Sequence, residues 1–138
     1  MIILDTDVVA VLMGTSRSAM AAQWFQQQDP ESIYLTTITR AEVRYGIARL
    51  PQGQRRDTYR QAADSFFTSQ LDRTLSFGPE AADLYGEIVA ERERRGHPIG
   101  IADAQIAAIA RTNHATVATR DSNGFEWTGI DVTDIVTA

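Results

Sequence analysis

The sequence contains neither cysteine nor lysine among its 138 residues. The absence of cysteine excludes disulfides, thiolate zinc sites and a cysteine nucleophile. The absence of lysine excludes a Schiff base and the lysine of a phosphate-binding P-loop. All 13 basic residues are arginines. Any contact to a phosphate group must therefore come from arginine, from backbone amides or from a metal ion.

Long apolar runs and secretion signals are also missing. No apolar run approaches the roughly 20 residues that span a bilayer, and the start MIILDTDVV lacks the positive region and cleavage site of a signal peptide. We expect a cytoplasmic protein without membrane contact, whose residues 1–138 form one domain. The net charge of −5 argues against a broad basic surface for nucleic acid, but not against a nuclease whose acidic centre holds cations.

Short apolar runs alternate with longer segments of helical periodicity along the whole chain. The expected strands are residues 2–5, 33–36, 74–77, 116–119 and 130–132. The expected helices are residues 5–13, 17–28, 39–50, 52–72, 79–95 and 102–113. This alternation predicts an α/β fold with a parallel sheet that helices cover on both faces.

Four acidic residues follow a predicted strand or open a predicted helix: Asp5, Glu42, Asp103 and Asp121. In an open parallel sheet these junctions lie along one edge, at the carboxyl ends of the strands. Carboxylates gathered there repel each other unless a cation lies between them. Their oxygen atoms suit Mg²⁺ or Mn²⁺, so the pattern indicates metal-assisted chemistry on an anionic substrate such as a phosphodiester.

Each of these acids also has a purely structural interpretation. Asp5 fits a helix N-cap, Asp103 fits the first turn of a helix, and Asp121 fits an Asx turn. Glu42 fits a capping box with Thr39. A sheet needs capped helices but does not need every cap to be acidic, so the joint pattern favours a functional cluster.

Four motifs occur in order, namely LDTDVV at 4–9, T-x-A-E-V-x-Y-G at 39–46, G-x-P-I-x-x-A-D-A-Q-I-A-A at 96–108 and A-T-R-D-x-x-x-F-x-x-x-G at 118–129. With these motifs the whole chain resembles the PIN-domain ribonucleases of the VapC and FitB type, which are toxins of toxin–antitoxin pairs. LDTD or TRD alone is a weak signal, whereas the four motifs at these spacings are highly specific.

The resemblance implies a PIN-like, doubly wound, five-stranded parallel sheet and an acidic cluster of Asp5, Glu42, Asp103 and Asp121 that binds Mg²⁺, with Mn²⁺ as a substitute. It also implies RNA cleavage, a cognate VapB- or FitA-like antitoxin, contact with operator DNA only through that antitoxin, and a homodimer. Part of the helix pair at 39–72 is implied to receive the antitoxin.

The chain departs from the family pattern at three places. Asp7 stands where the family often has Asn or Ser, which adds negative charge near the metal. Asp121 stands where many relatives have Asn followed three residues later by Asp, and the later position here is Gly124. The tail VTDIVTA at 132–138 lacks the common Asn/Asp-Pro-aromatic ending, which concerns the packing of the last strand rather than the chemistry.

In the expected mechanism, Asp5 and Asp103 hold the metal and Asp121 completes the site directly or through water. Glu42 orients a metal-bound water or assists proton transfer. Thr6 and Thr119 are candidates to hydrogen-bond these carboxylates, with core packing of their hydroxyl groups as the equal alternative.

Two groups of arginines are candidates for contact with the substrate. Arg40 and Arg44 flank Glu42 and share a helix face, so we expect them to contact the substrate. The run RERR at 92–95 closes a predicted helix, and we interpret it as a solvated helix end, where cations favour the dipole.

Two other functions remain open. An aspartate-dependent phosphatase fits the D-x-D-x-V pattern after the first strand, although the missing lysine and the short chain argue against it. A catalytically silent PIN-like binding module is the second, and the intact set of four acids argues against it.

Overall fold

Five parallel strands form the centre of the molecule, in the order β3-β2-β1-β4-β5. The computed structural model describes residues 1–135, so the last three residues of the tail motif lie outside the described residues. The strands are β1 (Ile2–Leu4), β2 (Ile33–Thr36), β3 (Thr74–Leu75), β4 (Thr116–Thr119) and β5 (Asp131–Asp134). The helices are α1 (Thr6–Met13), α2 (Ala19–Gln26), α3 (Thr37–Ala48), α4 (Gln54–Ser69), α5 (Pro79–Arg94) and α6 (Ile101–Thr112), and η1 (Pro30–Ser32), η2 (Leu71–Arg73) and η3 (Ser122–Phe125) are short 3₁₀ turns.

Strand β1 lies in the middle of the sheet and pairs with β2 on one side and with β4 on the other. Ile3 stands opposite Tyr34 and Val117 in this register. From β1 the chain first builds the sheet outward through β2 and β3, and then returns to the other side for β4 and β5. The crevice between the carboxyl ends of β1 and β4 is therefore the point where such sheets bind ligands.

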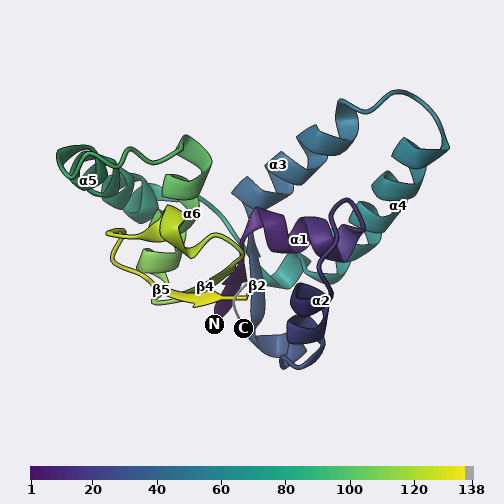
Figure 1. Cartoon of the computed structure of the whole chain (residues 1–138), viewed down its shortest axis with the longest axis horizontal. Helices are drawn as coiled ribbons and strands as arrows, with labels where there is room; N and C mark the ends of the chain where they lie inside the picture. The colour runs from purple at the N-terminus through teal and green to yellow at the C-terminus, as the bar shows by residue number, and fades with distance from the viewer. Residues whose placement is uncertain (136–138) are drawn as a thin grey trace.

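Helices cover both faces of the sheet (Figure 1), and the fully buried Ile3 and Leu4 of β1 point to opposite faces. Leu4 packs into an apolar cluster with side chains of α1, α3 and α4, such as Val8, Ile47 and Phe67. Ile3 packs into a second cluster with side chains of α5 and α6. Figure 1 shows α3 and α4 as a hairpin on one side of the sheet and α5 with α6 on the other.

The predicted fold is confirmed, with differences at the ends of elements. Strand β3 is only two residues long, and β5 extends to Asp134 instead of ending at residue 132. Helix α3 begins two residues earlier than predicted, because the side chain of Thr36 accepts a hydrogen bond from the Thr39 amide at 3.1 Å and so supplies the N-cap. Within residues 1–135, no helix combines the length and the apolarity needed to cross a membrane.

Candidate active site

Asp5 follows β1 directly and is held from two sides. Its Oδ1 accepts a hydrogen bond from the Thr6 amide at 2.8 Å, so Asp5 is the N-cap of α1, as its structural interpretation required. Its Oδ2 accepts a hydrogen bond of 2.8 Å from the hydroxyl of Thr119 at the end of β4. Only 7% of Asp5 is exposed. Asp5 therefore both caps α1 and lies in the crevice between the carboxyl ends of β1 and β4.

Glu42 reaches the same place from α3. The Thr6 hydroxyl donates a hydrogen bond of 2.6 Å to Glu42 Oε1, and the hydroxyl oxygens of Thr6 and Thr39 lie 3.0 Å apart. The predicted capping box of Thr39 and Glu42 is wrong, since Thr39 is a buried residue inside the helix and Thr36 is the cap. Glu42 is exposed and thus free to act on a bound ligand.

Asp103 lies in the first turn of α6 and Asp121 follows β4. The side chains of both residues lie close to Gly124. A Cβ atom at Gly124 would lie 3.3 Å from Asp121 Oδ2 and 3.9 Å from Asp103 Oδ2. The Thr119 hydroxyl accepts a hydrogen bond from the Asp121 amide at 3.0 Å, so Thr119 links the loop of Asp121 to Asp5. Asp121 makes no side-chain capping bond at the start of η3.

Asp7 is a fifth carboxylate of this cluster. Its Oδ2 accepts a hydrogen bond from the Arg120 amide at 3.3 Å, whereas its Oδ1 is buried without a hydrogen-bond partner among the described residues. The sequence signal for Asp7 is the spacing D-x-D after β1, which we interpret both as added negative charge near the metal and as the pattern of the phosphatase alternative.

Burial shapes the acid–base behaviour of Asp5 most strongly. It raises the pKa of the Asp5 carboxyl, and the negative charge of Asp7 raises it further, to about 7. The hydrogen bonds from Thr119 and Thr6 act in the opposite direction but do not offset the burial. Without a cation, Asp5 is therefore partly protonated at neutral pH.

The other acids are coupled to one another by charge. Burial raises the pKa of the Asp103 carboxyl, and the negative charges of Glu42, Asp121 and Asp7 raise it further. Burial also raises the pKa of Asp7. The arrangement is thus a dense set of carboxylates whose ionised forms need a positive charge nearby.

Arg92 is a buried positive charge near these carboxylates. The interpretation of the whole run at 92–95 as a solvated helix end is therefore wrong for Arg92. Arg92 is only 6% exposed, and its guanidinium donates hydrogen bonds to the carbonyl oxygens of His97 at 2.6 Å, Gly124 at 2.8 Å and Glu126 at 3.0 Å. Its charge lowers the pKa of Asp103. The rest of the run behaves as predicted, since its other two arginines are exposed and pair with Glu91.

Arg40 and Arg44 lean toward α4. The guanidinium carbon of each lies 5.2 Å from the centre of the Phe67 ring, and Arg44 Nη1 pairs with Asp64 Oδ1 at 2.7 Å. Stacking and ion pairing therefore account for where their head groups lie. Their contact with a substrate stays a prediction.

The carboxylates lie near one another, but their oxygen atoms are not arranged around a single metal-binding position. Within residues 1–135, no three histidine or acidic side chains are already arranged as the ligand set of one ion. Asp5 and Glu42 instead point their oxygens at Thr6 and Thr119.

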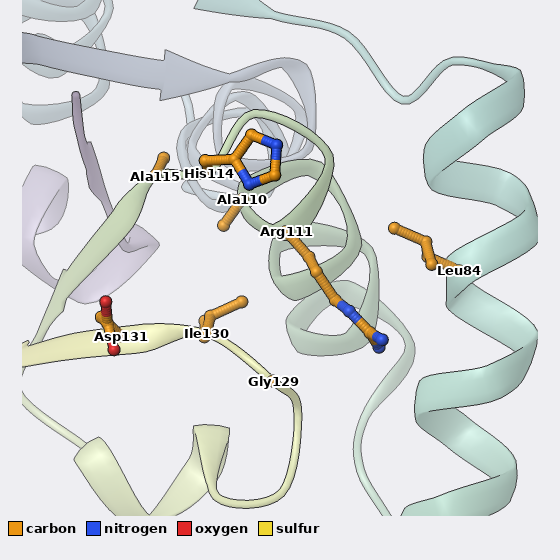
Figure 2. Close-up of a pocket in the computed structure, with 8 residues that line it drawn as sticks. All are labelled: Leu84, Ala110, Arg111, His114, Ala115, Gly129, Ile130 and Asp131. Carbon is orange, nitrogen blue, oxygen red and sulfur yellow. The ribbon is translucent and has the colours of Figure 1, made fainter.

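A separate pocket of about 430 Å³ lies at the opposite edge of the sheet, where α6 ends and β5 begins (Figure 2). Its polar side chains are Arg111, His114 and Asp131. None of the predicted site residues lines it, and the chemistry predicted from the sequence belongs to the carboxyl ends of the strands instead.

Comparison with known proteins supports the fold and the family resemblance. The PIN domain family matches residues 2–129. The plasmid stability protein StbB of Pseudomonas syringae pv. tomato is 40% identical over 96% of both chains. The VapC ribonuclease Y4jK of Sinorhizobium fredii is 36% identical over 96% of this chain and 95% of its own length. A solved structure of FitAB bound to a DNA fragment contains a chain that superposes with a TM-score of 0.89 at 30% identity, over 99% of this chain and 96% of the other.

Proposed function

Because this chain belongs to the PIN domain family, we propose that it is a VapC- and FitB-type toxin that cleaves RNA phosphodiesters in a Mg²⁺-dependent reaction. The observation that carries this proposal is the meeting of Asp5, Glu42, Asp103 and Asp121 in the crevice between β1 and β4. Relatives named as ribonucleases support the same reaction.

The donor set fits a hard divalent cation. It consists of carboxylate oxygens, and the buried Oδ1 of Asp7 lacks any partner among the described residues, which is unfavourable unless a positive group faces it. Asp5, Asp103 and Asp121 would hold the ion. When bound, Mg²⁺ or Mn²⁺ lowers the pKa of a water molecule and polarises a phosphoryl oxygen.

The residues of the chain then have separate tasks. Glu42, oriented by the Thr6 hydroxyl, accepts a proton from the attacking water. Thr119 fixes the rotamer of Asp5 and ties the loop of Asp121 to it, so two ligands from different loops keep their relative position.

The FitAB structure on DNA supports a second protein as partner. We propose that an antitoxin neutralises this chain and carries any contact with operator DNA, and that the toxin acts as a homodimer in the cytoplasm. RNA is its substrate in this account.

The alternatives differ in the role they give to Asp5. A phosphatase needs Asp5 as an exposed nucleophile, but Asp5 is 7% exposed and both of its oxygens accept hydrogen bonds. The test is cleavage of total RNA by the purified protein with Mg²⁺, with a chelator, and with the variant Asp5→Asn. Cleavage by the parent in Mg²⁺ alone supports the proposal. If the parent protein does not cleave RNA, the result favours the catalytically silent binding module. If it releases phosphate without cutting the RNA strand, the result favours the phosphatase.

A further inference from the structure

A groove of about 290 Å³ runs beside the acidic cluster, between α1, α3 and the first half of α4. Thr6 and Glu42 belong to its lining, so the groove is continuous with the candidate active site. Its apolar lining comes from Ala10, Val43, Ile47, Leu50 and Tyr59. The groove therefore offers an apolar surface directly next to the place where a phosphate group would react.

Gly46 lines this groove from the last turn of α3. Its backbone has no positive φ, and a Cβ atom added to it would meet nothing within 4 Å. Glycine weakens a helix interior relative to alanine, so neither turn geometry nor close packing explains its presence. What the missing side chain provides is open space in the groove.

Arginines stand at the exposed rim of the groove. Within residues 1–135, neither Arg49 nor Arg55 forms an ion pair with a carboxylate, although Arg44 nearby does. The guanidinium of Arg55 lies 5.6 Å from the ring centre of Tyr59, on the next turn of α4. Residues 49–60 contain four arginines and one aspartate in a chain whose net charge is −5. This segment beside the groove therefore carries a net positive charge in an acidic protein.

We propose that this groove is a subsite for one unstacked nucleotide of single-stranded RNA, next to the phosphate held at the acidic cluster. The base enters the space left by Gly46 and packs on Tyr59 and the apolar wall, and Arg49 and Arg55 contact the flanking phosphates. Arg49 and Arg55 at the rim form no ion pair among the described residues and are complementary to phosphate groups, so charge favours RNA as the occupant of the groove. The inference rests on the proposed ribonuclease function and names residues that position its substrate.

The test measures binding rather than cleavage, which separates it from the test of the function. A fluorescent single-stranded RNA of mixed sequence is titrated with the parent and with Gly46→Leu in the presence of a chelator. Nothing lies within 4 Å of a Cβ added at Gly46, which lines the groove, so the leucine is chosen to occupy the groove's space. Gly86→Leu is the matched control, because Gly86 also lies inside a helix with open space around it but outside the groove. We expect Gly46→Leu to weaken binding roughly fivefold or more, as loss of a stacked base does, and Gly86→Leu to leave it unchanged.

The arginines are tested by the salt dependence of the same titration. Arg49→Gln and Arg55→Gln should each lower the slope of log K against log salt by about 0.7, the value for one phosphate contact of a single strand. Arg94→Gln, which removes an arginine already paired with Glu91, should leave the slope unchanged. Unchanged RNA binding in Gly46→Leu and in both rim variants would overturn the subsite, even if the parent cleaves RNA. If Gly46→Leu weakens only the complex with the antitoxin, the groove belongs to the protein partner and the proposal is wrong.

Discussion

The guanidinium of Arg92, at the end of α5, donates a hydrogen bond of 2.8 Å to the carbonyl oxygen of Gly124. Gly124 is the residue whose backbone borders both Asp103 and Asp121. A buried cation on one helix therefore fixes the loop that closes the acidic cluster, and its charge acts on Asp103 at the same time.

Replacement of Arg92 by methionine should lower the free energy of unfolding by about 3 kcal/mol. Three carbonyl oxygens would lose a charged donor in a buried place, and methionine would keep much of the packing volume. Chemical denaturation measures the change. The control is Arg94→Met on the exposed side of the same helix, for which we expect less than about 0.5 kcal/mol. Equal effects of the two substitutions would show that Arg92 is not a structural cation.

Local sequence patterns predicted where the acidic residues lie in the fold, because neighbouring residues indicate where a strand ends and a helix begins. Asp5, Glu42, Asp103 and Asp121 were located in this way, and the parallel sheet brings their junctions to one edge. The helix start at Thr37 was misplaced because Thr36 and Thr39 are both plausible caps, and only the backbone geometry decides between them.

Side-chain direction was harder to predict than position. Arg92 and Arg94 are neighbours in a basic run, yet one is buried and the other is exposed. The difference depends on carbonyl groups of a loop far along the chain, which no local pattern reveals. The same holds for Arg40 and Arg44, whose head groups are drawn to Phe67 on another helix.

Replacement of Asp103 by asparagine should leave the melting temperature of the metal-free protein unchanged or raise it, while Mg²⁺-dependent RNA cleavage is lost. The substitution removes a charge that burial and three neighbouring carboxylates disfavour. Thermal unfolding in a chelator and an RNA cleavage assay check the two parts. Cleavage at the parent's level would remove Asp103 from the site.

The stability of the metal-free protein should fall as the pH rises from about 4 to about 7. The pKa of Asp5 is about 7 in the folded state against 3.8 as its ordinary value, so the folded state keeps a proton that the unfolded chain releases. Its contribution to stability is complete below the lower value and is lost as the pH rises through the higher one. Within this window the Asp5 contribution changes by about 1.4 kcal/mol per pH unit. The difference in unfolding free energy between Asp5→Asn and the parent, measured in chelator from pH 4 to 8, should grow with pH, and a difference that stays constant would contradict the burial of the charge.

The place of Gly124 suggests a rescue experiment. Asp121→Asn should raise the Mg²⁺ concentration that gives half-maximal cleavage, because a site with one carboxylate fewer binds the ion more weakly. A second substitution, Gly124→Asp, places a carboxylate at a backbone position whose Cβ borders Asp103 and residue 121. The double variant should require less Mg²⁺ than Asp121→Asn alone. The matched control combines Asp121→Asn with Gly124→Asn, which has the same size without the charge, and equal Mg²⁺ requirements of the two double variants would refute the idea.

The most direct measurement of the central claim is the initial rate of RNA cleavage as a function of Mg²⁺ concentration for the parent, Asp5→Asn and Asp121→Asn. The account predicts a saturable rate for the parent and no cleavage by Asp5→Asn at any Mg²⁺ concentration, because a primary ligand is missing. For Asp121→Asn it predicts a shift to higher Mg²⁺ that exceeds the loss in the saturated rate. A rate for Asp5→Asn that equals that of the parent, or parent cleavage that persists in chelator, would contradict a metal-dependent ribonuclease centred on this cluster.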